Sequence, residues 1–174
     1  MREKAFGGDD EVFAAFEAFV QQRSTELLRT ARLLTANHSD AEDLLQDALA
    51  GLARHWEAVS RDGHPEAYVR RALHNGAIDG WRRRRTRPHV VAEPSEHTPS
   101  AGDRFADVDS RLALREALTQ LPPRQRAVII LRYYEQLTEA EAAEVLGCSI
   151  NTVKSQTRHA MTRLRGLSLE EVLR

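Results

Sequence analysis

Residues 138–165 predict two short helices joined by a sharp turn, and this pattern limits the possible folds of the chain more than any other. Thr138 followed by Glu141 has the spacing of an N-terminal capping box, and Gly147 suits the turn after the first helix. Ser149 can then cap the second helix. The segment is therefore predicted to be a helix-turn-helix, an arrangement with which many proteins enter the major groove of DNA.

The second of these helices has two unlike sides. The side expected to pack carries residues at helical spacing, namely Val153, Thr157, Ala160, Met161 and Leu164. The opposite side has polar side chains and cations but no acid, and consists of Asn151, Lys154, Ser155, Arg158, Thr162 and Arg165. A pair of surface helices whose cations are only solvated is the alternative, but the two caps and the glycine turn together favour DNA binding.

The N-terminal part of the chain, residues 12–85, predicts three helices. The first ends near Asn37, Ser39 opens the second, and Pro65 suits the first turn of a third that extends to about Arg85. We expect these helices to form one compact bundle. Its core positions would be Phe13, Phe16, Val20, Leu27, Leu28, Ala31, Leu34, Leu44, Leu45, Ala48, Leu52, Trp56, Tyr68, Val69, Ala72 and Leu73.

Residues 86–109 follow neither a helical nor a strand period and are rich in proline and polar residues, so a flexible linker is expected there. Residues 110–168 predict a second bundle, in which Pro122 and Pro123 separate a first helix from a second one at about 124–133. The first helix should bury Leu112, Leu114, Ala117, Leu118 and Leu121. No convincing alternating strand is present, so the fold class is all-α: two small helical bundles joined by a linker, with tails at 1–11 and 169–174.

The composition excludes several classes of protein. Of the 174 residues 41% are hydrophobic and 29% charged, with a mean hydropathy of -0.51, which indicates a soluble, helix-rich chain. No run approaches the ~20 apolar residues of a membrane span, and the first residues are unlike a signal peptide, so we expect a cytoplasmic protein without membrane insertion. Cys148 is the single cysteine and is expected to pack, and the seven histidines lack metal-ligand spacing. We expect no metal, no cofactor and no enzymatic activity, because no catalytic pattern is visible.

The second helix carries an acidic stripe. Asp40, Asp43, Gln46 and Asp47 recur at spacings of three and four, so they share the side that the leucines leave free. Such a surface can dock a basic partner by charge complementarity. The pattern alone favours a plain solvated face.

The third helix aligns Arg71, Asn75 and Asp79 on one side and ends in the arginine cluster 82–85, next to Trp81. Arginine can neutralise phosphates, asparagine and aspartate can bond to base edges, and tryptophan can stack on bases. A solvated helix end is the alternative, but several cations beside an aromatic favour nucleic-acid binding. For Trp81 alone, core packing and stacking fit equally well, whereas Trp56 is expected in the core.

Taken in order, these segments resemble an extracytoplasmic-function (group 4) sigma factor of the sigma-70 family, and within it the SigE-like group. The sequence DAEDLLQDAL at 40–49 is similar to the part of sigma domain 2 that docks on RNA polymerase, and 65–85 to the part that melts and recognises the promoter −10 element. LPPRQR at 121–126 and NTVKS at 151–155 are similar to sigma domain 4, which reads the −35 element. The chain would then divide into sigma domain 2 at 12–85 and sigma domain 4 at 110–168.

The resemblance implies that the partners are core RNA polymerase, through its β′ clamp helices and β flap, and promoter DNA, with an anti-sigma factor as a further candidate. Core-polymerase contacts would come from Asp40, Asp43, Gln46 and Asp47. Contacts to the −10 element would come from Arg71, Asn75, Asp79, Trp81, Arg82, Arg83, Arg84 and Arg85. Contacts to the −35 element would come from Ser149, Asn151, Thr152, Lys154, Ser155, Arg158, His159 and Thr162.

An autonomous helix-turn-helix transcription regulator is the alternative function, with the first bundle sensing a ligand or forming a dimer. It predicts tight operator binding by the free protein. A sigma factor instead predicts weak promoter binding until core polymerase joins.

Overall fold

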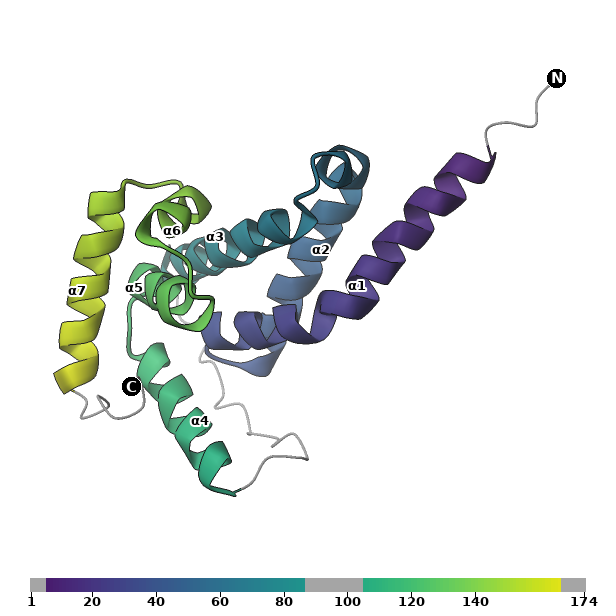
Figure 1. The fold of residues 1–174 in the computed structure, drawn as a ribbon. Helices are drawn as coiled ribbons and strands as arrows, with labels where there is room; N and C mark the ends of the chain where they lie inside the picture. The colour runs from purple at the N-terminus through teal and green to yellow at the C-terminus, as the bar shows by residue number, and fades with distance from the viewer. Residues whose placement is uncertain (1–5, 87–104, 167–174) are drawn as a thin grey trace.

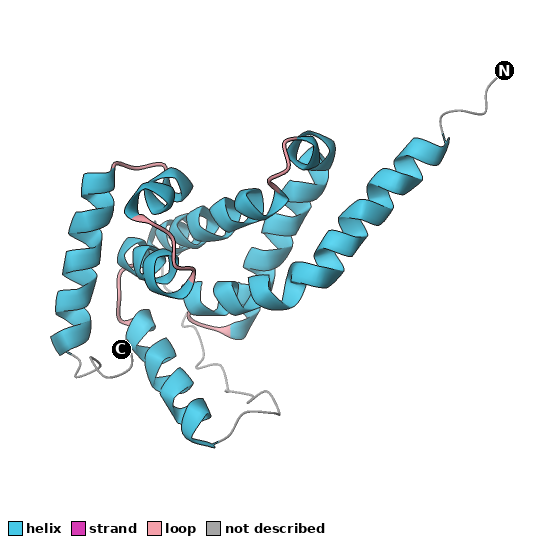
Figure 2. Ribbon diagram, viewed as in Figure 1, coloured by secondary structure: helices cyan, strands magenta, loops and turns pink. Residues whose placement is uncertain are grey.

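The computed structural model describes residues 6–86 and 105–166, with side chains at 10–85 and 112–166. Nearly all of this part of the chain is helical and no strand occurs in it (Figure 2), which confirms the expected all-α fold. No helix within these ranges is both long and apolar enough to cross a membrane. The outer part of the expected N-terminal tail, the whole of the expected C-terminal tail and most of the expected linker, residues 87–104, lie outside the described residues.

Three long helices form the N-terminal half: α1 (Phe6–Leu34), α2 (His38–Arg61) and α3 (Pro65–Thr86). The start of α2 differs from the prediction, because Asn37 rather than Ser39 is the N-cap, and its side chain accepts a hydrogen bond from the backbone N–H of Asp40. The interior of α2 is as expected, with Leu44, Leu45, Ala48, Leu52 and Trp56 all buried.

The first turns of α1 project away from the rest of the molecule (Figure 1). Phe13 is 66% exposed there, so its predicted core position is wrong. Nearer the body, the rings of Phe16 and Phe19 lie 5.3 and 5.7 Å from the ring of Trp56. The helix therefore becomes part of the core only where α2 lies beside it.

The C-terminal half consists of α4 (Phe105–Thr119), α5 (Pro123–Ile129), a π-helical turn η1 (Ile130–Tyr134), α6 (Glu139–Leu146) and α7 (Ile150–Gly166). The helix α4 begins inside the expected linker, since residues 105–109 are helical. The break at Pro122 and Pro123 occurs as predicted. The backbone N–H of Glu135 donates to the Ile130 carbonyl, five residues earlier, which ends the second helix in a π-helical turn that the sequence did not predict.

The predicted helix-turn-helix is confirmed in its details. Thr138 and Glu141 form the reciprocal capping box, and Gly147 has the left-handed φ of 60° that a side chain would disfavour. The Ser149 hydroxyl accepts from the N–H of Thr152, at 3.1 Å, and so caps α7. The packing side of α7 is buried at Val153, Ala160 and Leu164.

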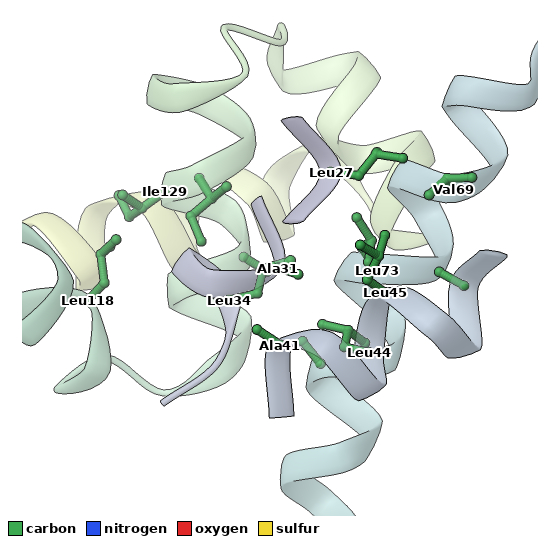
Figure 3. Packing of buried hydrophobic residues seen from close by; sticks show 14 of the residues in the cluster. Leu27, Ala31, Leu34, Ala41, Leu44, Leu45, Val69, Leu73, Leu118 and Ile129 are labelled. Atoms are coloured by element: carbon green, nitrogen blue, oxygen red, sulfur yellow. The ribbon is translucent and has the colours of Figure 1, made fainter. Parts of the chain in front are cut away.

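The two halves share one hydrophobic core instead of having two separate ones. Leu27, Ala31 and Leu34 of α1 belong to the same buried cluster as Leu118 and Ile129 of the C-terminal half (Figure 3). A second, smaller cluster lies between the helix-turn-helix and the preceding helix, to which Val128 and Leu131 belong. Both bundles exist as predicted, but they are packed against each other, which the sequence did not indicate.

Candidate nucleic-acid interface

The acidic stripe lies on the outer side of α2. Asp43, Gln46 and Asp47 are exposed, whereas the side chain of Asp40 is only 28% exposed. The cause is an ion pair, because Oδ2 of Asp40 lies 2.9 Å from Nη1 of Arg84 at the end of α3. The acidic stripe is therefore in contact with the arginine cluster, although the sequence analysis predicted two separate surfaces.

A groove of about 320 Å³ lies between these two helices and is lined by Asp40, Asp43 and Asp47 on one side and by Gly76 and Gly80 on the other. A Cβ at Gly76 would lie 2.8 Å from a methyl of Leu44. Glycine at this position therefore permits the close approach of α3 to α2, which explains its presence inside a helix.

The arginine cluster, residues 82–85, is exposed at the C-terminal end of α3. Trp81 is 40% exposed, so it is not a core residue, and the guanidinium carbon of Arg85 lies 5.3 Å from its ring centroid. Asp79 forms a 3.6 Å ion pair with Arg82. This end of α3 presents an aromatic ring among cations, a combination suited to stacking on bases and neutralising phosphates.

Arg71 and Asn75 lie further back on α3 and differ in accessibility. Arg71 is exposed, but the side-chain amide of Asn75 donates to the carbonyl of Val145 in α6, at 3.2 Å. Val145 lies in the last turn of α6, where carbonyls lack a helical partner. Asn75 thus satisfies a helix end in the opposite half, and its side chain is only half-exposed.

A second groove, of about 330 Å³, separates the two halves at this point. Asn75, Asp79 and Arg82 line it from α3. Its opposite wall is the start of the helix-turn-helix and of α7, including Cys148 and Thr152. Candidate −10 residues and candidate −35 residues therefore face each other across one groove.

Glu135 joins the halves through a polar cluster that the sequence did not reveal. One carboxylate oxygen accepts from Arg70 and the other lies 2.8 Å from Nε2 of His74. The side chain of His74 is fully buried and that of Glu135 is 10% exposed. Burial alone would raise the pKa of Glu135, but the hydrogen bonds and charges of His74 and Arg70 outweigh it and hold the pKa below its ordinary value.

Arg126 is a second buried polar group at the contact between the halves. Its guanidinium donates to three carbonyls at the end of α4, those of Leu118, Thr119 and Leu121, and to the Leu34 carbonyl at the end of α1. Burial, with the charge of Arg84, lowers the pKa of Arg126 to about 10. The planar guanidinium binds carbonyls at two helix ends, one from each half.

The second helix of the helix-turn-helix, α7, displays most of its candidate residues. Ser149, Asn151, Lys154, Arg158, His159 and Thr162 are exposed, and Thr152 and Ser155 are half-buried. Nζ of Lys154 lies 3.6 Å from a carboxylate oxygen of Glu139 in α6, a surface pair that adds little stability and leaves the amine available. Apart from Thr152, which also lines the groove, this side of α7 is free to approach a duplex.

Together the surfaces offer an acidic docking face, an aromatic and cationic end of α3, and a polar basic side of α7. Among the described residues no group of His, Cys, Asp or Glu is arranged to hold a metal ion. The arrangement suits binding to nucleic acid and to a basic protein partner.

Comparison with known proteins follows the same division. Residues 19–87 match the model for sigma-70 region 2, and residues 111–164 match that for sigma-70 region 4. The RNA polymerase sigma-E factor of Streptomyces coelicolor is 40% identical over 155 residues, covering 86% of this chain and 84% of its own. The ECF RNA polymerase sigma factor SigM of Mycobacterium tuberculosis is 33% identical over 153 residues, covering 88% of this chain and 76% of its own.

Among solved structures, the chain resembles one in the co-crystal of the sigma factor RpoE with the anti-sigma factor NepR from Bartonella quintana. The TM-score is 0.69 at 25% identity, and the match covers 90% of this chain and 98% of the other. The match therefore spans both halves of the chain.

Proposed function

Because the chain belongs to the sigma-70 family, in its extracytoplasmic-function branch, we propose that it directs transcription initiation through three surfaces. It binds core RNA polymerase and promoter DNA, and the polymerase carries out the chemistry. The N-terminal half corresponds to region 2 and the C-terminal half to region 4. The observation that carries the proposal is the order of the two matched regions over most of the chain.

The docking surface for core polymerase is the outer side of α2, with Asp43, Gln46 and Asp47 as its exposed residues and Asp40 at its edge. Exposed carboxylates on a rigid helix favour fast and specific association with a basic partner. The ion pair of Asp40 with Arg84 links this surface to the DNA-binding end of α3.

The −10 element is bound by α3. Arg82, Arg83, Arg84 and Arg85 hold phosphates of the separated strands, and Trp81, exposed beside them, stacks on a base. Arg71 adds a phosphate contact. Asn75 and Asp79 contact base edges once the groove between the halves is open.

The −35 element is read in duplex form by α7. Lys154 and Arg158 project from its exposed side and supply base or phosphate contacts. Ser149, Asn151, Thr152, Ser155, His159 and Thr162 complete the surface, and the helix N-terminus favours a phosphate.

The protein has no catalytic role of its own in this proposal and works where RNA polymerase works, in the cytoplasm. The structural neighbour from Bartonella quintana is a sigma factor bound to an anti-sigma factor. An anti-sigma factor is by that likeness a partner to look for here.

Reconstituted transcription tests the proposal. The purified protein would be added to core polymerase with a library of promoter fragments, and specific start sites would be mapped. We expect initiation at a defined set of promoters only when both proteins are present. Tight operator binding by the free protein, with neither core binding nor initiation, would instead identify an autonomous regulator.

A further inference from the structure

We propose that the free chain is held closed by a polar latch, made of Arg70 and His74 in the N-terminal half and Glu135 in the C-terminal half, and that in the closed form the side-chain amide of Asn75 is engaged by α6. The effect of closure on DNA binding rests on the proposed function. Closure itself does not, because it concerns contacts within one chain.

The latch is a buried cluster of polar and charged side chains joined by hydrogen bonds. Arg70 and His74 lie on α3 one helical turn apart and bind the two oxygens of one carboxylate. Glu66 steadies Arg70 from the preceding turn and also pairs with Arg23 of α1, each at about 3 Å. The carboxylate of Glu135 therefore enters a site that the N-terminal half has already arranged.

Such a cluster favours one arrangement of the halves over others. A carboxylate withdrawn from water loses hydration, and only well-placed partners offset that loss. A shifted docking of the halves would leave Glu135 or His74 buried without a partner. The latch therefore favours this closed form over other arrangements of the halves. The shared apolar core supplies much of the free energy that holds the halves together.

Two further hydrogen bonds cross between the halves and support the same arrangement. Asn75 donates to Val145 of α6, and Arg126 donates to Leu34 of α1. Both satisfy carbonyls at helix ends, which water can equally satisfy when the halves separate. The bond of Asn75 is thus easily exchanged, whereas Arg126, like the latch, has a buried charge to rehydrate.

Closure affects the −10 surface directly. The amide of Asn75 is already bonded to a protein carbonyl, and α6 lies over it. The start of α7, at Thr152 and Gln156, shares the same groove. A base can accept the hydrogen bond of the Asn75 amide only in place of the Val145 carbonyl, so promoter capture at this residue competes with closure.

Cys148 provides a reporter of opening. It is the single cysteine of the chain, lies half-buried at the helix-turn-helix corner and lines the groove between the halves. Burial raises the pKa of its thiol, which slows reaction with thiol reagents in the closed form. Separation of the halves would remove the wall of the groove that α3 forms and so ease access to the thiol.

The test compares Glu135→Gln with a matched control, Glu144→Gln, which removes the same charge from an exposed position on α6. The rate of Cys148 modification by a small thiol reagent and the radius of gyration from X-ray scattering are measured on the free protein. For Glu135→Gln we expect a rate increase of about tenfold, from the loss of charge-assisted hydrogen bonds, together with a larger radius. For Glu144→Gln we expect both values to stay as in the wild type.

Arg70→Gln is a second variant, which alters the latch at a less buried residue. We expect Arg70→Gln also to raise the rate of Cys148 modification. Circular dichroism checks that each variant keeps its helices. If both variants keep their helices and neither changes the rate or the radius, the latch does not hold the halves and the proposal is overturned. If Glu135→Gln unfolds, Arg70→Gln decides the outcome alone.

These measurements use neither polymerase nor promoter. A failure of transcription with the wild-type protein would therefore contradict the proposed function and leave the latch standing. Conversely, active transcription combined with unaltered thiol reactivity in the variants would contradict the latch and leave the function standing. As a link between the two, Glu135→Gln should bind single-stranded −10 DNA more tightly than the wild type in the absence of polymerase.

Discussion

The guanidinium of Arg126 donates a 2.9 Å hydrogen bond to the main-chain oxygen of Leu34, a residue 92 positions earlier in the chain. The same group binds three carbonyls at the end of α4. One side chain thus holds the end of α4 together and fixes its position against α1.

Arg126→Lys should destabilise the protein, because an ammonium group cannot reach all four carbonyls with the fork of a guanidinium. We expect the free energy of unfolding to fall by about 2 to 4 kcal/mol, since each buried carbonyl left unpaired costs about 1 to 3 kcal/mol. Urea unfolding measures this. Arg124→Lys, at an exposed neighbouring position, is the control and should change stability by less than about 0.5 kcal/mol. Equal effects of the two substitutions would refute the role of Arg126.

Charge reversal on the acidic stripe should weaken docking on core polymerase. Asp43→Lys with Asp47→Lys removes two exposed carboxylates and should reduce the association rate by about tenfold or more at low salt. Glu57→Lys, exposed further along α2, is the control and should have a small effect. Binding kinetics with immobilised core polymerase distinguish them, and an unaltered rate in the double variant would remove both residues from the docking surface.

Substitution of the two tryptophans should distinguish an effect on stability from an effect on DNA binding. Trp56→Ala removes a buried ring in contact with Phe16 and Phe19 and should lower the free energy of unfolding by about 3 to 5 kcal/mol. Trp81→Ala should leave unfolding nearly unchanged but weaken binding of single-stranded −10 DNA, in complex with polymerase, by about 1 to 3 kcal/mol. A large loss of stability for Trp81→Ala with unaltered DNA binding would show that this residue has a structural role instead.

The contribution of Glu135 to stability should depend on pH in a defined direction. Arg70 and His74 of α3 face its carboxylate, and Glu66 and Arg23 lie beyond them in the same cluster. Since these neighbours hold the pKa of Glu135 below the ordinary value of 4.5, its contribution is complete above that value and is lost as the pH falls through the lowered pKa. The difference in unfolding free energy between the wild type and Glu135→Gln should therefore shrink on acidification. Urea unfolding at several acidic pH values would reveal a constant difference if the carboxylate were not the relevant group.

The sequence was sufficient where the structure depends on neighbours along one helix. The capping box of Thr138, the turn at Gly147 and the cap at Ser149 each involve residues a few positions apart, and all three were predicted. The buried side of α2 was likewise evident from its period. These features are local, so the order of residue types is enough to define them.

The sequence was insufficient where the result depends on which helix lies beside another. Phe13 has the spacing of a core residue, but α1 extends beyond its neighbours at that point and the ring is exposed. Asn75 has the spacing of a DNA-reading residue, yet it bonds to α6. The partners of Glu135 lie 61 and 65 residues away, and helical periodicity carries no information on such pairs.

The π-helical turn places one surplus residue in the helical path immediately before Glu135. Since a regular α-helix rotates by about 100° per residue, the same residues in an unbroken α-helix would turn the carboxylate by more than a quarter of a circle, away from α3. Attachment of the halves is thus sensitive to the backbone geometry of this segment as well as to its side chains.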